Sequence, residues 1–149
     1  MRSVVQRVFA ARVDVDGQTV GSIGPGLVAF VGAGRDDTDH DAHYIADKVA
    51  GLRVFPDDAG KMSRAVAESG GAVLAVSQFT VYGDVRRGRR PSFDTAKEPV
   101  EAERLFDAFV QRLRTTGVSV ETGRFRAMMR VVVDNDGPVT ILLDSAKVF

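Results

Sequence analysis

The sequence of 149 residues contains no cysteine and no tryptophan, and only two histidines. Without cysteine, the chain cannot form disulfides, thiolate zinc sites, iron–sulfur clusters or a cysteine nucleophile. His40 and His43 lie among four aspartates, which is typical of an exposed helix start whose acids favour the positive end of the helix dipole. The alternative is a weak metal site at i, i+3 spacing. We expect no metal site, and no histidine that serves as a general base.

The sequence also lacks a net charge, because 20 Lys and Arg balance 20 Asp and Glu. Residues 1–12 contain three arginines and no acid, and residues 84–97 contain five basic residues against two acids. Residues 33–60 are acidic, with seven aspartates against three basic residues. A net charge of zero therefore disfavours a protein that coats nucleic acid non-specifically, but it allows one basic face on the surface.

Long apolar runs are missing as well, although 44% of the residues are hydrophobic. No stretch reaches the roughly 18 apolar residues of a membrane span, and the N-terminal segment alternates instead of resembling a signal peptide. A chain of this length is typical of one domain that buries its own core. We expect a single cytoplasmic domain over residues 1–149.

Apolar periodicity predicts an α/β domain with mainly antiparallel strand pairing. Helical spacing predicts one helix that begins at Thr38 or Asp39, and a second that begins at Pro99 and ends before Gly117. Alternating or continuous apolar runs predict strands at residues 4–15, 18–23, 27–31, 53–55, 72–82, 118–122, 128–134 and 139–144.

Polar side chains end the apolar run of residues 72–82. Ser77, Gln78 and Thr80 follow the run, together with Phe79. One interpretation is a strand that leaves the core with ordinary alternation. The other is a polar notch, in which these side chains and backbone N–H groups at the strand end hold a carbonyl or an oxyanion. Such a notch needs no ionisable group.

A second unusual segment has the sequence Asn135-Asp136-Gly137-Pro138-Val139-Thr140. It is consistent with a hairpin turn in which Pro138 opens the next strand. Alternatively, the fixed φ of Pro138 and the small size of Gly137 allow successive carbonyls to face a ligand at close range.

Six segments match one known family when they are taken together and in order. They are Gln6-Arg7-Val8, Gly60-Lys61-Met62, Ser77-Gln78-Phe79-Thr80, Arg90-Pro91-Ser92-Phe93, Thr122-Gly123-Arg124-Phe125 and Asn135-Asp136-Gly137-Pro138-Val139-Thr140. On these motifs the chain resembles the D-aminoacyl-tRNA deacylases of the bacterial and eukaryotic type, over essentially its whole length.

The resemblance implies a fold in which antiparallel and mixed sheets form a barrel-like layer with two main helices packed on it. It implies hydrolysis of the ester between a D-amino acid and the 3′-terminal adenosine of tRNA, with glycyl esters also accepted. This reaction is a chiral proofreading step in translation. The resemblance further implies a homodimer that uses no metal or other cofactor and builds each pocket from both subunits.

Site residues follow from the same resemblance. Residues 77–80 would hold the ester, with backbone N–H groups near Gln78 and Phe79 facing the reacting carbonyl. Gly137 and Pro138 would enter from the partner subunit with a cis peptide bond, and their carbonyls would contact the amino group and α-carbon of the substrate. Arg7 would brace this insertion, and Phe125 would form part of the wall beside the terminal adenosine.

The shortage of catalytic bases agrees with this activity. An aminoacyl ester is already activated, and the neighbouring ribose hydroxyl can assist the attack, so the protein needs to supply only position and oxyanion stabilisation. Thr80 as a nucleophile is the competing mechanism, but the sequence offers no base to activate it. We therefore favour RNA-assisted hydrolysis.

The sequence departs from the family pattern at Arg126, where a small residue is expected, and at Val81, where leucine is more usual. Arg126 would change the rim of the pocket or its affinity for RNA.

Two functions of other classes stay open at this point. One is a non-catalytic nucleic-acid-binding dimer built on residues 86–90 with Tyr82 and Phe93 nearby. The other is a non-catalytic dimer that binds a small D-amino acid or metabolite.

Overall fold

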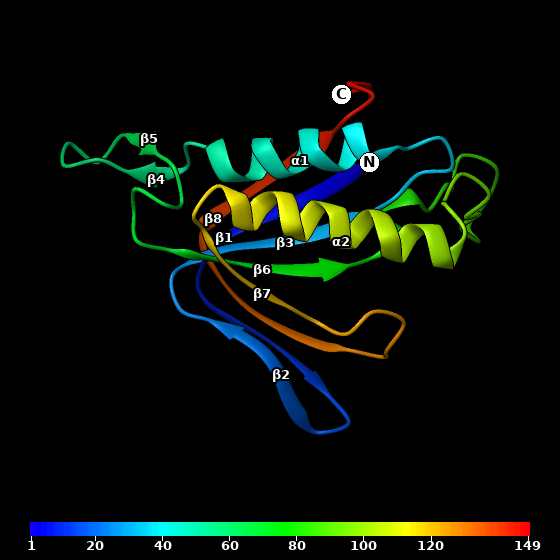
Figure 1. Cartoon of the computed structure of the whole chain (residues 1–149), viewed down its shortest axis with the longest axis horizontal. Helices are drawn as coiled ribbons and strands as arrows, with labels where there is room; N and C mark the ends of the chain where they lie inside the picture. Colours follow the sequence, from blue (N-terminus) through cyan, green and yellow to red (C-terminus); the bar gives the residue numbers. More distant parts are fainter.

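The sheet is built around the long strand β1 (Arg2–Val15), as seen in a computed structural model that describes residues 1–149 (Figure 1). β1 pairs antiparallel with β3 (Gly26–Gly32) along its first half and with β2 (Gln18–Ile23) along its second half. On its other edge it pairs with β8 (Arg130–Asp144) along nearly its whole length. β2, β3 and β8 are therefore all held in the sheet by hydrogen bonds to β1.

The rest of the main sheet is parallel. β3 pairs with β6 (Ala72–Ser77), and β6 pairs with β7 (Ser119–Thr122). The strand order is β2-β1-β3-β6-β7, with β8 on β1, and a separate two-stranded sheet joins β4 (Phe55–Pro56) to β5 (Met62–Arg64). The predicted α/β class with mixed, mainly antiparallel strands is confirmed.

The sheet curls until its two ends nearly meet. Gly21 of β2 lies so close to β7 that a Cβ atom there would collide with the backbone carbonyl oxygen of Thr122. The same Cβ would lie 3.4 Å from the Cδ1 atom of Leu74. Glycine at this position therefore permits the barrel-like closure.

Alternating residues of the central strands serve two hydrophobic cores. Leu27 and Ala29 of β3 belong to the larger core beneath the helices, whereas Val28 belongs to the smaller core inside the curled sheet. In β6, Val73 faces the larger core and Leu74 the smaller one. Because both faces are buried, these strands appear in the sequence as continuous apolar runs.

The two predicted helices are confirmed as α1 (Asp39–Gly51) and α2 (Pro99–Thr115), which lie side by side across one face of the sheet (Figure 1). Thr38 is the N-cap of α1, and its N–H group donates to the Asp41 carboxylate at 2.9 Å. In α2, Pro99 occupies the first turn, where its missing N–H costs no helical hydrogen bond. No helix is long and apolar enough to cross a membrane.

The predicted strand over residues 72–82 is wrong in its second half. β6 ends at Ser77, and residues Phe79–Tyr82 form a 3-10 turn, η1. The reason is that β3 ends at Gly32 and the backbone beyond it pairs with residues 95–97 instead, since the Lys97 N–H donates to the Ala33 carbonyl at 3.0 Å. Gly32 also makes room for the turn, since a Cβ there would meet the Gln78 carbonyl oxygen at 2.7 Å.

The predicted pair of strands at 128–134 and 139–144 is also wrong, because both segments belong to the single strand β8. Both halves pair antiparallel with β1, so the chain does not reverse between them. Val8 pairs with Asn135 and Gln6 with Thr140, which leaves residues 136–139 opposite the one residue Arg7. These residues form a bulge instead of a hairpin turn; "the bulge" below means residues 136–139.

We predict that Gly21→Ala destabilises the protein, because the added methyl group must push β2 away from β7. The expected loss is about 1–3 kcal/mol, as for other overpacked positions. Gly24→Ala is the matched control: no atom lies within 4 Å of a Cβ there, and its effect should stay within about 0.5 kcal/mol. Urea unfolding of both variants measures the difference. Equal stability of the two would contradict the proposed closure.

Candidate functional site

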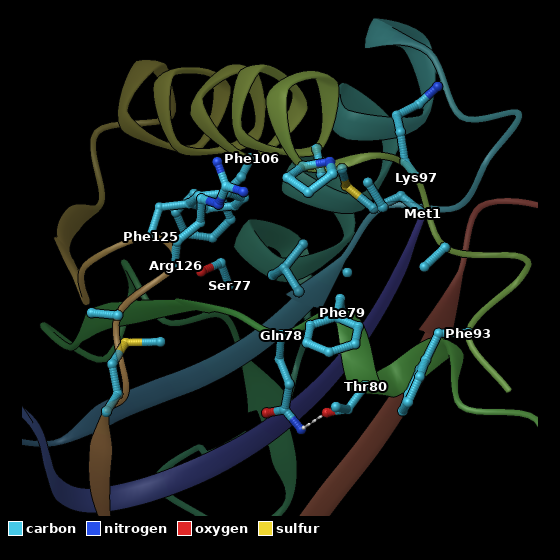
Figure 2. A pocket seen from close by; sticks show the side chains of 18 of the residues that line it. Met1, Ser77, Gln78, Phe79, Thr80, Phe93, Lys97, Phe106, Phe125 and Arg126 are labelled. Atoms are coloured by element: carbon cyan, nitrogen blue, oxygen red, sulfur yellow. Dashed lines mark hydrogen bonds between the residues drawn. The ribbon is translucent and has the colours of Figure 1, made fainter. Parts of the chain in front are cut away.

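A pocket of about 760 Å³ opens where β6 ends. Its walls come from the end of β3, the 3-10 turn η1, the start of α2 and the segment between β7 and β8. Ser77, Gln78, Phe79 and Thr80 all line it, and so does Phe125 (Figure 2). Five of the eight residues expected at the site are thus brought together in one cavity.

The change from strand to turn decides which backbone N–H groups beside this pocket stay unbonded. The N–H group of Gln78 donates to the Val31 carbonyl at 2.8 Å, so it is not available to a ligand. The N–H groups of Phe79 and Thr80, at the start of η1, donate to no group of the protein. Of the N–H groups expected near Gln78 and Phe79, that of Gln78 is thus already bonded, whereas those of Phe79 and the neighbouring Thr80 are unbonded.

The polar side chains of this segment interact with each other. The Nε2 atom of Gln78 donates to Oγ1 of Thr80 at 3.0 Å, as the dashed line in Figure 2 marks. Phe79 is more than half exposed, and its ring meets that of Phe93 edge to face, with centroids 4.9 Å apart. The turn thus presents an aromatic surface next to a hydroxyl and an amide.

Asp37 anchors the far end of η1. Its carboxylate accepts from the Tyr82 hydroxyl at 3.1 Å and from the Gly34 N–H at 2.5 Å, and it pairs with the N-terminal ammonium of Met1 at 2.5 Å. Burial, reinforced by this carboxylate, raises the pKa of Tyr82 well above its ordinary value. The phenol therefore keeps its proton, and its hydrogen bond to Asp37, throughout the physiological pH range.

A second aromatic wall lies across the pocket. Phe125, in the segment after β7, packs against Phe106 of α2 with ring centroids 6.3 Å apart. Phe106 is almost fully buried and belongs to the larger core, so this wall is held by the body of the protein. A flat, apolar ligand such as a nucleobase fits such a surface.

The ionisable side chains that line the pocket are those of Lys97 and Arg126, and no aspartate, glutamate or histidine lines it. His40 and His43 are exposed on α1, outside the pocket. No group of three or more His, Cys, Asp or Glu side chains could hold a metal ion. The pocket can therefore donate hydrogen bonds and attract anions, but it contains no side chain suited to act as a general base.

Arg7, Gly137 and Pro138 do not line this pocket; they meet each other at the bulge. The Nε atom of Arg7 lies 2.8 Å from the Asp136 carboxylate, and its Nη1 atom donates to the Val54 carbonyl. The Gly137–Pro138 peptide bond is cis, and both residues are exposed. The expected site residues thus occupy two separate places on one chain.

The sequence patterns missed several pocket residues. Phe106 falls on the apolar stripe of the second helix, where a core residue and a pocket wall give the same signal. In the sequence Lys97 is only one of five basic residues in segment 84–97, and no pattern indicates that Met1 lines the pocket.

Comparisons with known proteins match this arrangement. The family described as D-Tyr-tRNA(Tyr) deacylase matches residues 4–144. Proteins named D-aminoacyl-tRNA deacylase from Sorangium cellulosum and Symbiobacterium thermophilum are 67% and 62% identical, over 100% of this chain and 100% and 99% of theirs.

Two solved structures share the fold. One, described as a c-Myc DNA unwinding element binding protein, is 38% identical over 97% of this chain and 98% of its own, with a TM-score of 0.91. The other, a probable eukaryotic D-amino acid tRNA deacylase, is 16% identical with a TM-score of 0.83 and covers 95% of this chain and 97% of its own. The family match and these relatives confirm the resemblance found in the sequence motifs, and the chain belongs to the D-Tyr-tRNA(Tyr) deacylase family of ester hydrolases.

Proposed function

We propose that this protein hydrolyses the ester of D-aminoacyl-tRNA to free tRNA and D-amino acid, as a chiral proofreading enzyme of the cytoplasm. The observation that carries the proposal is the Ser77–Thr80 segment, which borders an aromatic pocket without any acidic side chain. Family membership supports the same substrate, since the relatives at 67% and 62% identity are named for it.

The free N–H groups at the start of η1 support an oxyanion site. An ester carbonyl placed against Phe79 and Thr80 would meet two donors that no protein group occupies. Such fixed donors stabilise the tetrahedral intermediate more than the planar ester, and this preference lowers the barrier. The aromatic wall at Phe125 is the surface against which we place the terminal adenosine.

The attack on the ester is assisted by the RNA. The pocket lining holds no carboxylate or imidazole, and the Thr80 hydroxyl accepts a hydrogen bond from Gln78. The ribose hydroxyl next to the ester is fixed close to the reacting carbon by the substrate itself, so it can orient or activate a water without a protein base. No metal or other cofactor takes part in this scheme.

Each pocket is completed by a second copy of the chain. Gly137 and Pro138 project from β8, are exposed, and lie outside the pocket of their own subunit. The ion pair between Arg7 of β1 and Asp136 of the bulge fixes the bulge against its own sheet. Phe9, in the strand beside the bulge, is 57% exposed, and such an apolar ring on a sheet surface favours a symmetric dimer contact.

Chirality is selected by main-chain atoms of the inserted bulge. The carbonyl groups of Gly137 and Pro138 would bind the amino group of the substrate and contact its α-carbon, where the side chain of an L-amino acid would clash. A D side chain would point away from this wall, and glycine has no side chain to exclude.

We predict release of D-tyrosine and glycine from their tRNA esters, and no release of L-tyrosine. Radiolabelled D-Tyr-tRNA, Gly-tRNA and L-Tyr-tRNA, each with and without protein, measure this selectivity. Binding of tRNA without release from any ester would support a non-catalytic nucleic-acid-binding dimer instead. Indifference to all three would favour a binder of small metabolites. Cleavage of D-Tyr-tRNA but not Gly-tRNA would contradict the steric wall.

Thr80→Ala should keep single-turnover deacylation within about tenfold of the unmodified protein, because the hydroxyl is not the nucleophile. Loss of a true nucleophile costs on the order of 10⁶ in rate. Thr115→Ala, at an exposed position of α2 outside the pocket, is the matched control. A loss of many orders of magnitude in Thr80→Ala alone would establish covalent catalysis.

A mixed dimer tests the shared pocket. Phe79→Pro removes one free N–H at a turn position that tolerates proline. Gly137→Val disrupts the bulge, because φ there is +123° and a Cβ would lie 2.7 Å from the Val139 Cγ2 atom. We expect each variant to be inactive alone.

An equal mixture of the two variants, unfolded and refolded together, should recover about a quarter of the normal rate, since half of the dimers then hold one intact site. Activity no higher than that of either parent would show that each bulge serves its own subunit. Thermal unfolding of each parent verifies that both variants fold.

A further inference from the structure

Arg126 occupies an unusual position at the rim of the pocket. It lines the cavity next to Phe125, its side chain is exposed, and its backbone has φ of +61°, in the left-handed region. Residues other than glycine rarely adopt this conformation, because the Cβ atom crowds the backbone. Glycine would fit the backbone at this position better, so stability does not explain the arginine.

The guanidinium of Arg126 has no partner in the protein. Seven other arginines form ion pairs, but Arg126 is in none of them and donates no side-chain hydrogen bond. The Lys97 side chain lies on the opposite side of the pocket in Figure 2, but its ammonium donates at 2.8 Å to the carbonyl oxygen of Arg35, a residue outside the pocket lining. No acidic residue lines the cavity between them.

The mouth of the pocket thus carries the unpaired positive charge of Arg126 and no negative charge. Such a mouth attracts an anion, and the planar fork of a guanidinium matches two oxygens of one phosphate. A compact amino acid bound in the pocket would not supply that anion, because its carboxylate is esterified in the proposed substrate. The phosphates that follow the terminal adenosine would supply it.

We propose that Arg126 binds a backbone phosphate of the last nucleotides of tRNA and so positions the aminoacylated 3′ end in the pocket. The inference rests on the proposed function, which places the adenosine against the adjacent Phe125. Arg126 acts as a positioning residue for the RNA and takes no part in the chemistry of the ester.

The test compares Arg126→Gln with Arg124→Gln. Arg124 lies two positions earlier in the same segment, is exposed, does not line the pocket and forms no ion pair, so its variant removes the same charge elsewhere. Two substrates are used: D-Tyr-tRNA, and the 3′-O-D-tyrosyl ester of adenosine, which has no phosphate. Thermal unfolding verifies that both variants are folded.

For D-Tyr-tRNA we expect Arg126→Gln to raise KM about tenfold with kcat little changed, as when one charged hydrogen-bond partner is lost. The slope of log KM against log salt should fall by about one. The adenosine ester should be cleaved by Arg126→Gln as by the unmodified protein, and Arg124→Gln should behave like the unmodified protein throughout.

Equal losses on tRNA and on the adenosine ester would overturn the proposal, since Arg126 would then shape the pocket itself. Equal KM values for Arg126→Gln and Arg124→Gln would also overturn it. Failure of the unmodified protein to cleave D-Tyr-tRNA would refute the proposed function instead. In that case the binding of tRNA that carries no amino acid is compared. Weaker binding by Arg126→Gln than by Arg124→Gln would still support the phosphate contact, and equal binding would refute it.

Discussion

The antiparallel pairing of β1 with three other strands sets the shape of the sheet and, through it, the position of the candidate site. Because β3 and β2 share one edge of β1 in succession, the sheet must bend between them, and it curls until Gly21 meets Thr122. Both halves of β8 pair with the other edge of β1. Residues 136–139 have only Arg7 opposite them, so they bulge out of the strand. The curvature of the sheet and the bulge in β8 thus both follow from the pairing of β1.

The site lies where this hydrogen-bonded framework ends. Once β3 stops at Gly32, the chain after Ser77 can no longer extend as a strand, and it turns with two N–H groups unpaired. Asp37 holds the other end of the turn by binding Tyr82, Gly34 and the N-terminal ammonium. Rigid placement of backbone donors is what oxyanion stabilisation requires, because donors that are already oriented need no reorganisation during the reaction.

The composition of the protein and the chemistry proposed for it agree. A pocket without carboxylates or imidazoles is poorly suited to activate a water or a hydroxyl, but it suits a substrate that brings both an activated ester and a neighbouring hydroxyl. The positive charge of Arg126 at its mouth suits a polyanionic substrate whose end enters the pocket. In the proposed mechanism, protein and RNA contribute different parts of the catalytic site.

Composition, local periodicity and short motifs were enough to predict the helices, the mixed α/β class and the family, and they showed that cysteine is absent and histidine scarce. The three-dimensional fold was needed to show that residues 79–82 turn, that β8 is continuous, and that the Gln78 N–H is already bonded to Val31. It also decided that Arg7 and Pro138 lie apart from the pocket of their own chain. Each of these features depends on where a strand distant in sequence begins or ends. Local sequence patterns contain no information about which distant strand a segment pairs with. The position of the site therefore follows only from the strand pairing in the folded protein.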